Sequence, residues 1–149
     1  MKKYLLIISC SDRKNRTDGL LPAMKRYIGA WYEVIEKLRR EDRLPQNLDT
    51  VIISAKYGFL KSNDLIKYYD LRMTEDRAEE LNPKILDDFK SLLSNNRYEA
   101  IFINLGNDYM PAIKGLEHII SQDTKLNFAE GRVGERKSQM KKWILSLET

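Results

Sequence analysis

The stretch KYLLIISCSDRK, residues 3–14, decides the fold, because an almost continuous apolar run ends abruptly in a polar and charged loop. A strand that is apolar on both of its faces is typical of a sheet that is covered on both sides. A second buried strand is predicted at residues 48–55, a third strand at residues 98–106 and a short fourth strand at residues 125–131. The pattern therefore predicts a sheet of four strands buried between helices.

Helical spacing of apolar residues separates these strands. The spacing is clearest over residues 21–41, where a stripe of apolar residues predicts one helix. Further helices are predicted from Thr74 onwards, with a fresh start at Asn82-Pro83, and over residues 110–121 and 134–148. Residues 56–73 have no clean period and are predicted to form a long loop with a short strand or turn.

Strands and helices thus alternate along the chain, and helical crossovers between buried strands imply a mainly parallel sheet. No internal repeat, low-complexity tract or linker rich in Gly, Pro or Ser interrupts the pattern. We therefore expect a single α/β domain over residues 1–149. Its predicted fold class is a three-layer sandwich with a mainly parallel four-stranded sheet, of the Rossmann-like or flavodoxin-like type.

The composition, 42% hydrophobic and 32% charged, is that of an ordinary soluble protein. No apolar run approaches the roughly 20 residues that span a bilayer. The basic start is followed by an apolar run too short for a signal peptide. A single cysteine cannot form an internal disulfide, which suits a reducing compartment. We therefore expect a cytoplasmic protein with no membrane partner.

The net charge of +4 is unevenly distributed. Residues 1–16 and residues 131–142 each carry five cations against one carboxylate, whereas residues 75–88 carry six carboxylates against two cations. If the two basic ends meet in the fold, they create one positive face. The alternative is that all three stretches are solvated helix surfaces.

Polar residues and glycines follow each of the four predicted strands. In a parallel sheet these carboxyl ends share one edge, and ligands of such folds bind there. A thiol, several cations, hydroxyls and glycines at one edge suit an anionic or heteroaromatic ligand. We expect Cys10 and Lys14 to be the catalytic residues. The expected ligand-binding residues are Ser9, Ser11, Arg13, Ser54, Lys56, Gly58, Gly106, Gly131 and Gly134.

Cys10 has two interpretations. The nearby cations Arg13 and Lys14 would favour its thiolate, which is the nucleophilic form. Alternatively, Cys10 is a small buried residue at the end of a strand, as free cysteines often are. The single His118 is expected on the polar side of its helix, without a catalytic role. One cysteine and one histidine argue against a zinc site, and we expect no metal or cofactor.

The second strand runs into the sequence SAKYG, where Lys56 could hold a phosphate or carboxylate and Gly58 would permit close backbone approach. Alternatively, Lys56 is a solvated lysine in a tight turn. Three tyrosines of the following loop, Tyr57, Tyr68 and Tyr69, suit either stacking on a base or packing of the loop onto the sheet.

Three motifs together resemble a known family. They are the C-x-x-x-K pattern from Cys10 to Lys14, the SAKYG pattern from Ser54 to Gly58, and YDL beginning at Tyr69. This combination resembles a family of short uncharacterised α/β proteins described only as a domain of unknown function. The resemblance covers most of the chain, and it implies the α/β fold but no activity.

The first motif also resembles part of the catalytic motif of archaeosine synthase, Pro-Cys-x-x-x-Lys-Pro-Tyr-x-x-Ser-x-x-His. In that family the cysteine is implicated in attacking the nitrile carbon of a 7-deazaguanine base in tRNA. Cys10 and Lys14 match, whereas Ser9 replaces the first proline, and Asn15 and Arg16 replace Pro-Tyr. The resemblance implies that Cys10 is a nucleophile.

Three functions remain open at this stage. The first is an enzyme that processes a nucleotide, a nucleobase or a modified base at a site around Cys10. The second is a non-catalytic module that binds a nucleotide or nucleic acid, with binding that weakens steeply as salt rises. The third is an accessory protein whose acidic stretch, residues 75–88, contacts another chain. A nucleotide or nucleobase is the expected ligand, and nucleic acid is the second class of partner.

Overall fold

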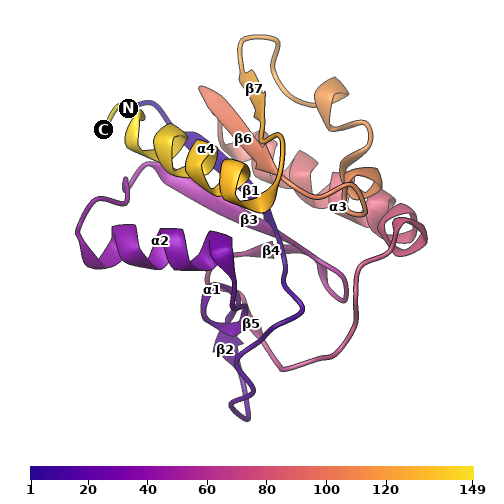
Figure 1. Cartoon of the computed structure of the whole chain (residues 1–149). Coiled ribbons are helices and arrows are strands. Elements are labelled where there is room, and N and C mark those ends of the chain that lie inside the picture. Colours follow the sequence, from indigo (N-terminus) through magenta and orange to yellow (C-terminus); the bar gives the residue numbers. More distant parts are fainter.

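The computed structural model describes all 149 residues. A five-stranded sheet forms its centre, in the order β4-β3-β1-β6-β7 (Figure 1). Four neighbouring strands run parallel: β1 (Tyr4–Ser9), β3 (Leu48–Ser54), β6 (Ala100–Asn104) and β7 (Lys125–Phe128). The carboxyl ends of these four strands therefore share one edge of the sheet.

The expected number of four strands is wrong, because β4 (Gly58–Lys61) adds a fifth that is antiparallel to β3. Ser54 pairs with Gly58, so the chain turns back immediately after β3. Phe59 packs edge-on against Phe89, with ring centroids 5.0 Å apart. At four residues this strand is too short to be recognised inside an unperiodic segment.

Helices lie on both faces of the sheet. In Figure 1, α2 (Ala30–Arg40) and α4 (Val133–Leu145) run side by side in front of the strands, and α3 (Glu75–Asn95) lies behind them. Two short 3-10 helices, η1 (Met110–Ile113) and η2 (Leu116–His118), follow β6, and η1 packs against α3. The expected mixed α/β class with a mainly parallel sheet is therefore confirmed.

The single helix expected over residues 21–41 is interrupted. The chain instead forms β2 (Leu21–Pro22), the short α1 (Ala23–Arg26) and then α2. The strand β2 pairs antiparallel with β5 (Leu65–Ile66), which is a further short strand of the expected loop. These two short strands form a separate small sheet beside the main one.

Pairing with a distant segment explains the break between α1 and α2. Tyr27 has an extended backbone and forms an isolated antiparallel bridge with Lys14. The amide of Ile28 donates to the carbonyl of Arg13 at 3.0 Å. The loop after β1 therefore satisfies backbone groups that an uninterrupted helix would pair internally.

The helix α3 continues through Asn82-Pro83, so the expected fresh start at this point is wrong. Its N-cap is Thr74, whose side chain accepts a hydrogen bond from the amide of Arg77 at 3.1 Å. The side chain of Asn82 instead donates to the carbonyls of Ala112 and Lys114, which fixes the segment after β6 against α3.

The helix expected over residues 110–121 is also replaced, here by the two 3-10 turns. Gly115 separates them with φ of 94°, a left-handed conformation that an α-helix does not contain. His118 lies in the second turn, where it is largely exposed beside Glu117. No helix of the chain is both long and apolar enough to cross a membrane.

Candidate functional site

Cys10 and Tyr109 meet at the carboxyl edge of the sheet. Cys10 directly follows β1, Tyr109 lies in the loop after β6, and the Cys10 Sγ lies 3.1 Å from the Tyr109 hydroxyl. That hydroxyl also lies 3.3 Å from the Cys10 carbonyl oxygen, to which it can donate. Cys10 is only 7% exposed, so little of this residue is open to solvent.

Tyr109 keeps its proton at this position. Burial is the main cause that raises its pKa above the ordinary value, and the nearby Cys10 adds to the shift. A phenol that stays protonated remains a hydrogen-bond donor over the physiological pH range. Tyr109 can therefore donate to the sulfur or to the Cys10 carbonyl.

A hydroxyl network lies next to this pair. The hydroxyls of Tyr27 and Tyr69 are 2.6 Å apart, and the Ser54 hydroxyl lies 3.1 Å from the first and 2.9 Å from the second. All three side chains are buried. Burial, followed by proximity to Cys10, raises the pKa of both tyrosines above the ordinary value. The network thus stays neutral and connects the end of β3 to the residue that follows α1 and to the loop after β5.

Ser9, at the end of β1, accepts hydrogen bonds from two side chains of α2. Its carbonyl accepts a hydrogen bond from the Tyr32 hydroxyl at 2.8 Å, and its hydroxyl accepts one from the Trp31 indole at 3.3 Å. Burial and then Cys10 raise the pKa of Tyr32 well above the ordinary value. Ser9 therefore helps to dock α2 on the sheet.

Two lysines converge on the ring of Tyr69. The Nζ of Lys14 lies 4.5 Å from the centroid of that ring, and the Nζ of Lys56 lies 5.9 Å from it. Lys14 is only 8% exposed, its single hydrogen bond goes to the Asp12 carbonyl at 3.2 Å, and neither lysine forms an ion pair. A buried ammonium without a carboxylate, as at Lys14, is costly. The exposed Lys56 places a second unpaired cation at the same ring.

Two further side chains of the loop after β1 have partners within the protein. Asp12 forms an ion pair with Arg72 at 2.9 Å, which ties this loop to the segment that precedes α3. The Ser11 hydroxyl donates to the Arg13 carbonyl at 2.6 Å and accepts from the amide of Ile28 at 3.1 Å. Ser11 thus shapes the loop, while the side chain of Arg13 is left exposed.

The four glycines of the expected site occupy different surroundings. Gly58 is buried against α3, where an added Cβ would lie 3.3 Å from Ile85, and Gly106 lies beside the ring of Tyr109. Gly131 has φ of 91°, and Gly134 lines a groove between α2 and α4. The structure therefore brings Cys10, Lys14, Ser54 and Lys56 to the surroundings of Tyr69. Gly58 pairs with Ser54 but lies against α3, and Gly134 lies in the separate groove.

Sequence reasoning missed three residues of the site: Tyr27, Tyr32 and Tyr109. Tyr27 continues the apolar spacing of the helix predicted over residues 21–41, although its hydroxyl is central to the network. A buried tyrosine usually needs a partner for its hydroxyl, and eight tyrosines among 149 residues were the available signal. The number of tyrosines does not indicate which of them contact one another in the fold.

The fold and the site define an α/β protein with a thiol, two unpaired lysines and several tyrosines at the carboxyl edge of its parallel strands. The chain belongs to a family of unknown function (DUF6884), whose model matches residues 5–142. The sequence-based assignment to an uncharacterised α/β family is thus confirmed. A search of curated proteins found no match.

Among solved structures, the chain is similar to AF0587, a protein of unknown function, with a TM-score of 0.58 and 11% sequence identity. The similarity covers 99% of this chain but 46% of that one, so this chain spans about half the length of its structural relative. At this identity the similarity concerns the fold alone. The resemblance to archaeosine synthase depends on Cys10 and Lys14 alone.

Proposed function

We propose that this protein binds and processes a nucleotide, a nucleobase or a modified base at the carboxyl edge of the sheet. In this proposal Cys10 is the reacting thiol, and Lys14 and Lys56 hold an anionic group of the ligand. The observation that carries the proposal is the 3.1 Å contact between the Cys10 sulfur and the Tyr109 hydroxyl. This contact joins the loops that follow two neighbouring strands, β1 and β6.

The strand order supports this location. The parallel strands follow the order β3-β1-β6-β7, which resembles the flavodoxin-like arrangement and is compatible with the fold type expected from the sequence. The chain leaves β1 towards α2 on one face, whereas it leaves β6 towards η1, which packs with α3 on the other face. Open α/β sheets bind ligands where neighbouring connections diverge in this way.

The side chains near that point support an anionic, planar ligand. A phosphate or carboxylate would give Lys14 the counter-ion that it lacks. Lys56 is exposed and offers a second cation on the solvent side of the same ring. Tyr57 packs edge-on against Tyr69, with ring centroids 5.5 Å apart. Tyr57 is partly exposed, and a base that stacks on its ring gains about 1–3 kcal/mol.

A thiol at this place can react without a further reagent. When it adds to an electrophilic carbon such as that of a nitrile, the S–H bond breaks, an S–C bond forms, and one π bond of the nitrile is lost. The proton goes to the nitrile nitrogen. Because Cys10 is 7% exposed, Tyr109 must turn away before a base can reach the sulfur.

The burial of Cys10 favours a second candidate function, in which the same site binds a nucleotide or nucleobase without covalent chemistry. The thiol is then a buried packing residue that positions Tyr109. The two lysines and the tyrosine rings have the same role in both candidate functions. The two functions differ only in whether the Cys10 sulfur forms a covalent bond with the ligand.

Replacement of Lys14 by methionine is expected to weaken nucleotide binding at least tenfold, because the anion loses its buried counter-charge. Isothermal titration with AMP, GMP and a nitrile-bearing 7-deazaguanine base measures this change. Lys90→Met is the matched control, since Lys90 is exposed and lies in the second half of α3, whereas the Lys56 carbonyl is bound by Arg77 at the start of that helix. The control is expected to bind like the unsubstituted protein.

Intact-mass spectrometry separates the two candidate functions. An adduct on the unsubstituted protein that is absent from Cys10→Ser supports the thiol as the reacting group. Binding without an adduct, unchanged in Cys10→Ser, supports the non-covalent candidate. If none of the three compounds binds, or if Lys14→Met binds them as tightly as the unsubstituted protein, both candidates fail.

A further inference from the structure

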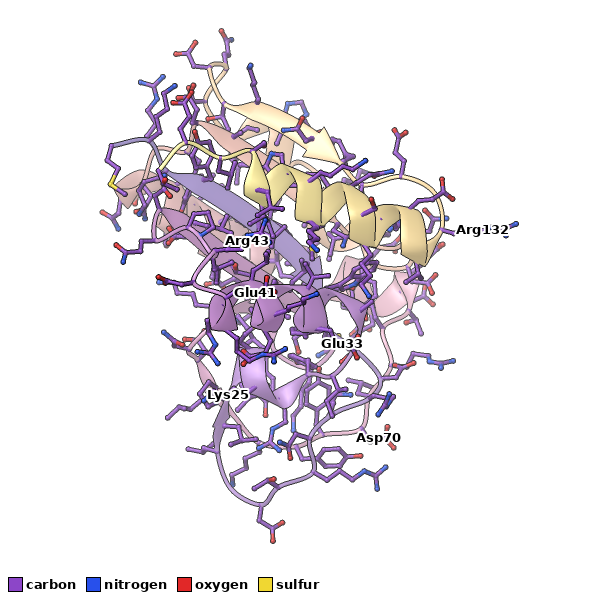
Figure 2. All side chains as sticks on the ribbon, turned by 60° about the vertical axis from the view of Figure 1, so that its left-hand side comes forward. Lys25, Glu33, Glu41, Arg43, Asp70 and Arg132 are labelled. Atoms are coloured by element: carbon purple, nitrogen blue, oxygen red, sulfur yellow. The ribbon has the colours of Figure 1, made fainter.

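A second feature lies outside the thiol site, in the groove between α2 and α4. Figure 2 shows these helices side by side, with Glu33 near the start of α2 and Arg132 at the start of α4. The groove has a volume of about 510 Å³. Its charged lining comprises four cations and one carboxylate, namely Lys37 and Arg40 from α2, Lys137 and Lys141 from α4, and Glu33.

None of these four cations has a partner within the protein. They form no ion pair and no side-chain hydrogen bond, whereas the neighbouring Arg39 is bound to Glu36 at 2.5 Å. Unpaired like charges around one groove repel one another, and they create a positive potential that attracts anions. An anionic ligand in the groove would screen the repulsion between the cations and would attract all four of them.

The spacing of the cations suits several phosphates in a row. Lys37 and Arg40 are three residues apart and Lys137 and Lys141 are four apart, so each pair lies on one face of its helix. At 1.5 Å per residue, the members of a pair are separated by about 4.5–6 Å along the helix axis. One pair of cations therefore lies along each side of the groove. A single phosphate would be too short to contact all four cations.

We propose that this groove binds the phosphate backbone of single-stranded nucleic acid. Its only apolar lining residues are Val34 and Leu38, and it has no aromatic ring on which a base could stack. Recognition in the groove is thus through phosphates, which is independent of sequence. A docked acidic peptide would need apolar pockets for its anchoring side chains. The small volume excludes a duplex from the groove.

This site goes beyond the nucleotide site at Cys10 and does not depend on it. The test is fluorescence anisotropy with a labelled single-stranded RNA 12-mer in low and in moderate salt. The double variant Lys37→Glu/Lys141→Glu is expected to lose at least tenfold in affinity at low salt. Its salt dependence should also be shallower, because each neutralised phosphate contributes a slope of about −0.7 for single strands.

The matched control is Lys90→Glu/Lys114→Glu, which makes the same change in net charge on the side of the sheet where α3 and η1 pack. Both lysines are exposed, and this variant is expected to stay within about threefold of the unsubstituted protein. Absence of RNA binding, or an equal loss in both double variants, would overturn the proposal. A duplex or an acidic peptide that binds as tightly as the RNA would also overturn it. Cys10→Ser should leave this binding unchanged, which keeps this outcome separate from that of the thiol site.

Discussion

Replacing Arg26 with alanine is expected to lower the free energy of unfolding by about 3–5 kcal/mol. Arg26 is fully buried. One of its terminal nitrogens donates to the carbonyls of Asn15 and Thr17 at 2.7 and 2.9 Å, and the other donates to those of Gly19 and Ile66 at 2.7 and 3.1 Å. One side chain thus holds the loop after β1 against β5.

The size of the effect follows from the surroundings of the guanidinium. No carboxylate pairs with Arg26, and its charge is stabilised by four carbonyl oxygens, which form stronger hydrogen bonds to a cation than to a neutral donor. Alanine would leave a cavity and remove all four donors. Lysine keeps the charge but has one nitrogen in place of the planar fork, so Arg26→Lys is expected to lose about 2 kcal/mol.

Urea unfolding followed by circular dichroism measures both variants. The control is Arg16→Ala, because Arg16 is an exposed arginine of the same loop whose guanidinium lies 5.4 Å from the centroid of the Tyr68 ring. This control is expected to change stability by less than about 1 kcal/mol. Arg26→Ala should also become sensitive to proteases within residues 15–19. A loss below about 1 kcal/mol for Arg26→Ala would show that the carbonyls find other donors.

The strands of the parallel sheet could be predicted because burial on both faces requires apolar residues at consecutive positions of the sequence. Residues Leu5 to Ile8 are all fully buried, and an uninterrupted apolar run of this length is typical of a strand that is covered on both faces. Since the strands are parallel, the same reasoning predicted that Cys10 and Lys14 would share an edge with Ser54 and Lys56. The structure brings these four residues together.

The interruption after α1 could not be predicted, because its cause lies elsewhere in the chain. Apolar spacing continues through Tyr27 and favours a helix, but the backbone there pairs with Lys14. The helical spacing likewise gives no sign that Arg26 is buried, with the carbonyls of a loop and of β5 as its partners. Local periodicity contains no information about such pairings.

The pairing of Cys10 with Tyr109 is the clearest case of this limit. The two residues are 99 positions apart, and Tyr109 was not among the expected site residues, although Gly106 of the same loop was. The sequence left open whether Cys10 is a reactive thiol or a small buried residue, and in the structure Cys10 is buried, with its sulfur beside the Tyr109 hydroxyl. Tyr109 lies in the connection between β6 and β7, directly before η1, and the side chain of Asn82 on α3 donates to the Ala112 carbonyl of η1.

Above pH 10 the protein is expected to lose stability steeply, because Tyr27, Tyr32 and Tyr69 are buried and their pKa values lie above the ordinary value of 10.0. In the unfolded chain these phenols release their protons near pH 10, whereas the native state retains them. The native state therefore binds more protons than the unfolded state, and its stability falls as the pH rises. Below pH 10 the phenols are protonated in both states, so the stabilisation that they contribute is fully present there.

Each of these three tyrosines lowers the free energy of unfolding by about 1.4 kcal/mol per pH unit above 10, or about 4 kcal/mol per unit together. Unfolding curves in urea between pH 8 and pH 11.5, with tyrosinate absorbance recorded alongside circular dichroism, measure the effect. The absorbance of the buried tyrosines should rise together with the loss of secondary structure. Tyr68→Phe, which removes a more exposed hydroxyl, should leave the curve unchanged, whereas Tyr27→Phe/Tyr69→Phe should make the decline shallower. If all tyrosines ionise near pH 10 while the secondary structure persists, the hydroxyl network beside Cys10 is open to water and the sulfur is more accessible than its surroundings indicate.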